Sequence, residues 1–201
     1  IRTVDLHTGG EPLRVFIDGL PEIKGSTILE KRRYFRDNFD YIRTGTMFEP
    51  RGHADMYGAV ITDSVSKDAD FGTFFLHNEG YSTMCGHAII ALTKLVFDTG
   101  LIQKKGRKLV IDAPPGKIYS QAIMEDNIVK GTSFQNVPSF LLYRNQEITI
   151  AEIGKLQFDV AFGGAFYVVC DADSLGLSLD ESNYNRLIDF GKKIKKAVMS
   201  N

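Results

Sequence analysis

The alternation of apolar and polar residues is clearest at the start of the chain. Residues 1–6, IRTVDL, and residues 13–18, LRVFID, alternate with a period of two, as a strand with one buried face does. Between them, residues 7–12 read HTGGEP, a run of turn-forming residues. The pattern predicts an antiparallel pair of strands joined by a polar turn.

Residues 26–45, STILEKRRYFRDNFDYIRTG, change to a helical period. Apolar residues recur there at helical spacing, and most of the remaining positions are charged. Thr27 with Glu30 fits the capping box that begins a helix, and Gly45 fits a C-terminal stop. We therefore expect an amphipathic helix with a solvated charged face.

Two strand-like runs lead into a second helical segment. Residues 58–63, GAVITD, and 72–78, GTFFLHN, are rich in β-branched and aromatic residues. From Gly86 to about Phe97 the chain is apolar on nearly every side of a helix. Because such a helix has no polar stripe to expose, we expect other elements to enclose it.

The second half of the chain reads mainly as strands. Beyond Gly100, short alternating segments separated by turn residues predict an antiparallel meander as far as Arg144. Residues 156–172, LQFDVAFGGAFYVVCDA, are two more strand-like runs around Gly163 and Gly164. The sequence therefore predicts a chain in which helices and largely antiparallel strands are both present, the α+β class.

A domain boundary is expected where the apolar pattern is interrupted. The charged segment YRNQEITIAEIGK covers residues 143–155, and a weaker helical pattern ends the chain at residues 181–201. We predict a first domain at residues 1–145 and the beginning of a second at residues 146–201.

Composition and charge limit the kinds of partner. The 201 residues carry 24 Lys and Arg against 25 Asp and Glu, so no strong net charge attracts nucleic acid or an anionic membrane. No run approaches the length of a membrane span, and the first ten residues lack a signal peptide's apolar core. The two cysteines form no C-x-x-C pair, which favours free thiols in a reducing compartment. We expect a cytoplasmic protein that binds a small molecule, and because the chain begins with Ile1 we expect at least a residue to have preceded it.

Cys85, in GYSTMCGHAIIALTKL, is the residue with the clearest chemical potential. It comes just before the predicted enclosed helix, where unpaired N–H groups and the helix dipole stabilise a thiolate and lower its pKa. The same N–H groups can hold a carboxylate, Gly86 lets a ligand approach the backbone, and His87 adds a donor or a charge. Free cysteines are also among the most buried residues, so the pattern alone leaves simple packing open. Cys170, with no helix start or neighbouring glycine, is expected in the core.

The remaining histidines offer weaker candidates. His7 and His53 lie in glycine-bearing turns, where either ligand contact or a local hydrogen bond is open to them. His77 is expected to be a satisfied histidine at a strand end. The spacing of His77, Cys85 and His87 fits no standard zinc pattern, and no phosphate, dinucleotide or flavin signature is present, so we expect neither metal nor cofactor.

Four segments, in order, resemble a known family. They are DLHTGGEPLRV at 5–15, MFEPRGHADMYGAV at 47–60, HNEGYSTMCGHAIIAL at 77–92 and FGGAFY at 162–167. All four are similar to the proline racemase-like proteins, which include proline racemase, 4-hydroxyproline epimerase and trans-3-hydroxy-L-proline dehydratase. The resemblance covers essentially the whole chain.

The resemblance implies a fold and a first half of an active site. The fold is diaminopimelate-epimerase-like, with two similar domains in which antiparallel strands wrap around a central helix, and it implies that the second domain here is incomplete. Cys85 matches the first catalytic position, and Gly86 with His87 matches the backbone cradle for a carboxylate. His7 and His53 become candidates for lining the site, as do Gly163 and Gly164.

The second catalytic position, in a motif of the type D-R-S-P-[CT]-G, does not occur in the chain. In the family it is cysteine in racemases and epimerases and threonine in the dehydratase. The segment HNEGYSTMCGHA is more similar to the dehydratase branch, so the resemblance implies cofactor-independent loss of water from trans-3-hydroxy-L-proline. Cys85 would remove the α-proton, and the product would be Δ1-pyrroline-2-carboxylate.

Two alternatives stay open from the sequence. One is a proline racemase or 4-hydroxyproline epimerase. The other is a truncated half-site that only binds an imino acid or supports an oligomer, since relatives tend to form homodimers.

Overall fold

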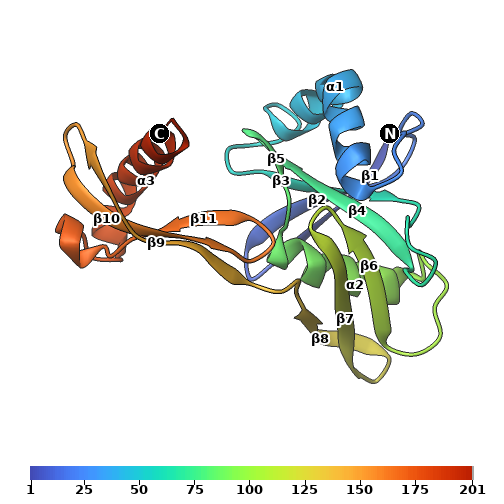
Figure 1. Cartoon of the computed structure of the whole chain (residues 1–201). Coiled ribbons are helices and arrows are strands. Elements are labelled where there is room, and N and C mark those ends of the chain that lie inside the picture. The colour runs from blue at the N-terminus through green and yellow to red at the C-terminus, as the bar shows by residue number, and fades with distance from the viewer. Residues whose placement is uncertain (201) are drawn as a thin grey trace. The chain divides into compact units, whose positions relative to one another are not determined.

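The computed structural model describes residues 1–200, which form two compact units, Ile1–Val137 and Pro138 onward (Figure 1). The predicted boundary at 145/146 falls inside strand β9 (Phe140–Ile150) instead of between the units. The charged residues there interrupt the apolar pattern because most of this strand is exposed, and not because the chain leaves one unit for another. None of the helices in residues 1–200 combines the length and the apolar composition that a membrane span requires.

Unit 1 is an eight-stranded sheet with two helices. Its elements are β1 (Arg2–Thr8), β2 (Glu11–Asp18), α1 (Ile28–Met47), β3 (Tyr57–Thr62), β4 (Phe71–His77), β5 (Gly80–Ser82), α2 (Gly86–Thr99), β6 (Lys108–Ala113), β7 (Gly116–Glu125) and β8 (Ile128–Gln135). The strand order is β1-β2-β3-β4-β6-β7-β8, and β5 pairs with β4. The predicted first hairpin, β1 with β2, is confirmed.

The sheet is mixed, whereas the sequence predicted largely antiparallel strands. β2 pairs with β3 in parallel, and so does β4 with β6. Each of these connections contains a helix, α1 in the first and α2 in the second. Parallel neighbours need such a crossover, so both parallel pairs follow from where the helices occur in the chain.

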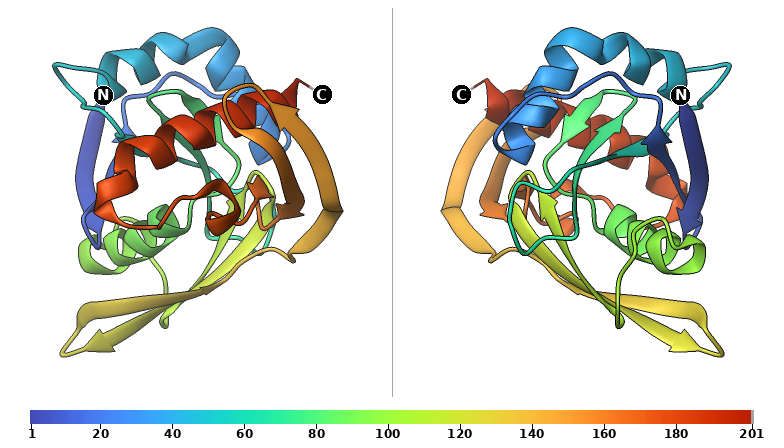
Figure 2. Two further views of the ribbon diagram at one scale, coloured as in Figure 1. Left: turned by 90° about the vertical axis from the view of Figure 1, so that its left-hand side faces the viewer. Right: turned by 90° about the vertical axis from the view of Figure 1, so that its right-hand side faces the viewer.

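The two helices cover opposite faces of the sheet (Figures 1 and 2). Along β2, Leu13 and Val15 belong to the core beneath α2, whereas Phe16 belongs to the core beneath α1. Helix α2 packs against β1, β2, β7 and β8, and its first three turns are buried on most sides. The predicted enclosure of this helix is confirmed.

Helix α1 begins as predicted and ends later. The Thr27 hydroxyl accepts from the Glu30 N–H, and the Glu30 carboxylate accepts from the Thr27 N–H, so the capping box is formed. Gly45 is not the stop, since the helix continues to Met47, whose side chain is fully buried. Pro50 lies just beyond the end, and a proline cannot continue a helix.

Unit 2 is a three-stranded antiparallel sheet in the order β11-β10-β9, with one long helix. Its elements are β9, β10 (Gly154–Phe162), β11 (Phe166–Val169), two short 3-10 turns (Asp173–Leu175 and Glu181–Asn183) and α3 (Tyr184–Met199). Ile194 of α3 packs with Ile150 and Leu156 in a small core.

Candidate active site

Cys85 is the N-cap residue of α2, three residues after the end of the short strand β5. Its backbone is extended, and its carbonyl accepts the first helical hydrogen bond, from the Ile89 N–H at 3.2 Å. The residue is only 6% exposed. The sulfur is hydrogen-bonded by the Ala88 N–H and by the Tyr57 hydroxyl. The cysteine is therefore both buried and in polar contact.

Burial raises the pKa of the Cys85 thiol to about 12, and the nearby Glu11 carboxylate acts in the same direction. The hydrogen bonds from Ala88 and Tyr57 favour the thiolate but are outweighed. The prediction that the helix start lowers the pKa of Cys85 is therefore wrong for this state of the protein. The free energy needed to remove a thiolate from water is larger than the stabilisation that the helix N-terminus gives it.

His87 lies against the cysteine in the first turn of α2. Its Nδ1 is 3.3 Å from Cys85 Sγ, and its ring meets the Tyr57 ring edge-on at 5.2 Å between centroids. The Thr8 hydroxyl donates to the His87 carbonyl at 3.0 Å, which attaches this turn to the end of β1. His77 stacks on Tyr57 at 5.3 Å, and its Nδ1 accepts from the Glu79 N–H, so the predicted satisfied strand-end histidine is confirmed.

Gly86 is the first residue of α2. The first N–H groups of a helix have no partner within it, and that of Ala88 points to the sulfur. A Cβ on Gly86 would lie 3.4 Å from Phe134 Cζ. The N–H groups of Gly86 and His87 thus begin a helix next to the thiol, where an anion can bind.

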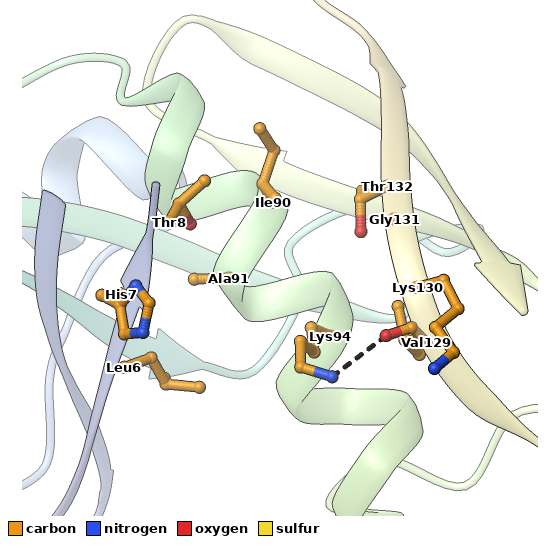
Figure 3. A pocket seen from close by; sticks show the side chains of 10 residues that line it. All are labelled: Leu6, His7, Thr8, Ile90, Ala91, Lys94, Val129, Lys130, Gly131 and Thr132. Carbon is orange, nitrogen blue, oxygen red and sulfur yellow. Dashed lines mark hydrogen bonds between the residues drawn. The ribbon is translucent and has the colours of Figure 1, made fainter. Parts of the chain in front are cut away.

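His7 lines a cavity of about 320 Å³ between β1, α2 and β8 (Figure 3). Its Nδ1 accepts from the Gly10 N–H at 3.3 Å. At the β8 side of the same cavity, Lys94 of α2 donates to the Val129 carbonyl at 3.1 Å (Figure 3). Cys85 does not line this cavity, although Thr8, whose hydroxyl donates to the His87 carbonyl, lines it beside His7.

His53 is exposed in the loop between α1 and β3. Its Nδ1 lies 2.6 Å from the Ala54 carbonyl, and its own carbonyl accepts from the Asn78 side chain. The positive field of His53 also contributes to lowering the pKa of Asp5, although the Arg14 side chain bonded to that carboxylate is the larger cause. His53 therefore interacts with residues of its own loop, 48–56, and through Asp5 with β1.

Gly163 and Gly164 form the turn between β10 and β11 in unit 2, whereas Cys85 lies in unit 1. Gly164 has a φ of +101°, which favours glycine, and the Gly163 N–H donates to the Ala165 carbonyl. Cys170 follows β11 and is half-buried beside α3 rather than fully enclosed, and burial raises its pKa.

Tyr57, Ser82 and Thr8 are site neighbours that the sequence did not single out. The Tyr57 hydroxyl is hydrogen-bonded to Ser82 Oγ as well as to the cysteine. All three lie in the family-like segments. They come close to Cys85 only because β1, β3 and β5, which carry them, are strands of one sheet in the folded protein. In residues 1–200, no group of three His, Cys, Asp or Glu side chains is arranged to hold a metal ion.

The family model for proline racemase matches residues 3–201. The chain belongs to the proline racemase family. It is 51% identical to a trans-3-hydroxy-L-proline dehydratase from Colwellia psychrerythraea, 45% to one from Bacillus cereus and 42% to one from Homo sapiens. These matches cover 98 to 99% of the chain but only 57 to 60% of the relatives' length.

Solved structures of the family share the fold. A hydroxyproline epimerase from Agrobacterium vitis, with bound trans-4-hydroxy-L-proline, matches with a TM-score of 0.89 at 24% identity. The match covers 98% of this chain and 58% of the epimerase chain. A probable proline racemase from Agrobacterium radiobacter, with bound carbonate, matches with a TM-score of 0.84, also at 24% identity, over 90% of this chain and 54% of its own. The predicted diaminopimelate-epimerase-like fold is confirmed at the level of these proline racemase family neighbours.

Proposed function

We propose that this protein acts as a trans-3-hydroxy-L-proline dehydratase with Cys85 as the base. The observation that carries the proposal is the placement of a thiol and an imidazole, Cys85 and His87, in one turn at the start of an enclosed helix. The relatives at 42 to 51% identity that carry the dehydratase name support the choice of reaction.

In this proposal the N–H groups of Gly86 and His87 bind the substrate carboxylate. The Cys85 thiolate removes the α-proton, and the electron pair released forms a double bond to C3 as the C3–O bond breaks. The leaving hydroxide takes a proton from an acid in the site and departs as water. The enamine then tautomerises to Δ1-pyrroline-2-carboxylate, and no cofactor is needed.

The raised pKa of Cys85 is compatible with this role once substrate is bound. An imino acid carries a protonated ring nitrogen next to its α-carbon, and in this proposal the N–H groups of Gly86 and His87 offset the charge of its carboxylate, so the ring nitrogen supplies the uncompensated positive charge close to the sulfur. An opposite charge within a few ångströms favours the thiolate and lowers its pKa. We therefore infer that the base is generated on substrate binding and is mostly protonated before it.

His7, His53, Gly163 and Gly164 remain proposed contributors to the substrate site. Their support is their position in the family-like segments. We also propose a cytoplasmic location and a homodimer, the first supported by the two free thiols, Cys85 and Cys170.

Replacing Cys85 by Ser tests the proposal in the protein at its natural length. Water elimination from trans-3-hydroxy-L-proline should fall by at least about 100-fold. A serine hydroxyl loses its proton far less readily than a thiol, so at neutral pH almost none of it is present as the anion that could act as the base. Cys170→Ser, which changes the same group in unit 2, should leave the rate unchanged. Elimination retained in Cys85→Ser would contradict the assignment.

The second candidate is a racemase or epimerase, favoured by the fold shared with the Agrobacterium vitis epimerase. Incubation with L-proline and 4-hydroxyproline in heavy water separates the two. Inversion with deuterium uptake and without dehydration would favour the second candidate. If trans-3-hydroxy-L-proline also binds, and none of the three ligands undergoes elimination or exchange, a half-site that only binds would instead be favoured.

A further inference from the structure

We propose that Tyr57 is a positioning residue for Cys85: its hydroxyl, held by Ser82, donates a hydrogen bond to the sulfur and stabilises the thiolate. This inference rests on the proposed role of Cys85 as the base. It adds a pair of hydrogen-bonded hydroxyl groups, those of Ser82 and Tyr57, which belong to strands and not to α2.

The geometry places the Tyr57 hydroxyl between two groups. Tyr57 is the first residue of β3, and its hydroxyl lies 2.5 Å from Ser82 Oγ, at the end of β5. Its ring contacts the ring of His87, whose Nδ1 is 3.3 Å from Cys85 Sγ, and at this place the Tyr57 hydroxyl also hydrogen-bonds the sulfur. Its ring is fixed on both sides of this contact by stacking on His77 and by the edge of His87. A ring held in this way has little freedom to take its hydroxyl away from the sulfur.

Counting protons gives the direction of these hydrogen bonds when Cys85 is ionised. A thiolate can only accept, and the Tyr57 hydroxyl has one proton, so this proton must point to the sulfur. The phenolic oxygen then accepts from the Ser82 hydroxyl, whose one proton turns to the phenol at 2.5 Å in preference to the Met84 carbonyl at 3.5 Å. Ionised Cys85 thus accepts from Tyr57 and from the Ala88 N–H, next to the His87 Nδ1 that lies 3.3 Å from the sulfur.

The arrangement has a consequence for the thiol's reactivity. Two elements that are distant in the chain supply donors to one buried sulfur, and each donor offsets part of the cost of a thiolate in a dry site. Removing the Tyr57 hydroxyl leaves the ring packing in place and removes only the donor. We therefore expect a smaller thiolate fraction at any given pH in Tyr57→Phe.

The test is the rate at which iodoacetamide alkylates Cys85 at pH 9, measured by mass spectrometry of the Cys85 peptide. Cys170 in the same sample is the internal reference, because it lies in the other unit. A hydrogen bond to a charged group contributes enough to change the thiolate fraction about tenfold or more, and the greater nucleophilicity of a more basic thiolate offsets part of this. The ratio of Cys85 to Cys170 alkylation should fall about three- to tenfold in Tyr57→Phe.

Two further variants make the result specific. Ser82→Ala removes the group that holds the hydroxyl without touching the sulfur, and should lower the ratio by a smaller factor. Tyr81→Phe removes another half-buried hydroxyl, one that donates to Asp40 of α1, and should leave the ratio unchanged. Wider access to the sulfur would raise the ratio, so a fall cannot come from an opened site.

The proposal is overturned if Tyr57→Phe keeps its circular dichroism spectrum and its ratio is unchanged or raised, or if Tyr81→Phe lowers the ratio equally. Should Tyr57→Phe lose its fold, Ser82→Ala decides, and an unchanged ratio there also overturns it. Alkylation involves no turnover, so this result stands apart from the proposed reaction. Elimination retained in Cys85→Ser would remove the dehydratase assignment and leave the Tyr57 contact as measured.

Discussion

The Nδ1 atom of His87 lies 3.3 Å from the sulfur of Cys85, two residues earlier in the chain. The pair is held in one turn because Cys85 caps α2 and the Thr8 hydroxyl fixes the His87 carbonyl to β1. A thiol and an imidazole in contact can exchange or share a proton. Residues of β1 and β3 therefore help to hold this arrangement at the start of α2.

Replacing His87 by Ala should lower kcat/KM for water elimination about 10- to 100-fold, since a hydrogen bond to a charged group contributes about 1.5–3 kcal/mol. Asn is the matched variant, because its side-chain amide nitrogen can occupy nearly the same place as Nδ1. We expect His87→Asn to recover part of the loss. If Ala and Asn lower kcat/KM equally, the loss does not come from the contact between the His87 side chain and the sulfur.

Replacing Gly86 by Ala separates a carboxylate cradle from a packing role. The new Cβ would lie 3.4 Å from Phe134 Cζ, a contact the fold can accommodate, so the melting temperature should change little. A methyl group where the carboxylate approaches the backbone should raise KM for trans-3-hydroxy-L-proline at least about tenfold.

Phe134→Leu provides the control for that variant. If the rise in KM comes from the contact with Phe134, the double variant should restore the normal value. If it comes from obstruction of the ligand, the double variant should keep the raised KM. Unchanged KM in Gly86→Ala alone would rule out the cradle.

The raised pKa of Cys85 predicts a stability that falls as the pH rises. The ordinary thiol pKa is 9.0 and the folded value is about 12, so between these values the unfolded state loses a proton that the folded state keeps. The stabilisation is complete below pH 9 and is lost above it, at about 1.4 kcal/mol per pH unit. Urea unfolding between pH 8.5 and 10.5, followed by circular dichroism, measures this slope.

Cys85→Ala is the matched comparison for the slope, because tyrosines and lysines titrate in the same range in both proteins. Its free energy of unfolding should fall less steeply with pH than that of the unaltered protein. Cys170→Ala, which removes a half-buried thiol, should change the slope less. Parallel curves for all three proteins would contradict the prediction.

Replacing Thr27 by Ala should lower the free energy of unfolding by about 1 kcal/mol, because the Glu30 N–H loses its acceptor at the start of α1. Thr44→Ala makes the same chemical change later in that helix, where the hydroxyl bonds back to the Asp40 and Tyr41 carbonyls. It should be neutral or slightly stabilising, since Ala is the better helix former. Equal losses in both variants would show that the cap is not the cause.

Local features were predictable from the sequence wherever a short pattern has one physical solution. The capping box of Thr27 and Glu30 and the β1–β2 hairpin formed as expected. Helix α2 is enclosed as its apolar residues required. The order of the four family-like segments also identified the family, which no single segment could do.

The boundary between the units and the parallel strand pairs were not predictable in the same way. An exposed strand such as β9 carries charge without leaving its sheet, so a charged segment does not mark a linker. The parallel pairs β2–β3 and β4–β6 depend on which strands meet after a helical crossover, and the period of a strand does not say which neighbour it takes.

The sequence by itself determined where Cys85 lies, at the start of an apolar helix and next to glycine and histidine. Only the tertiary structure decided the state of its thiol, because the pKa depends on how much water surrounds the sulfur and on partners from other elements. Burial in the core of unit 1 raises it to about 12, while Tyr57 from β3 and the Ala88 N–H oppose this rise. The stabilisation of a thiolate by a helix N-terminus depends on a few neighbouring residues in the chain. The desolvation that opposes it depends on all the elements that pack around the sulfur, and these are known only from the tertiary structure.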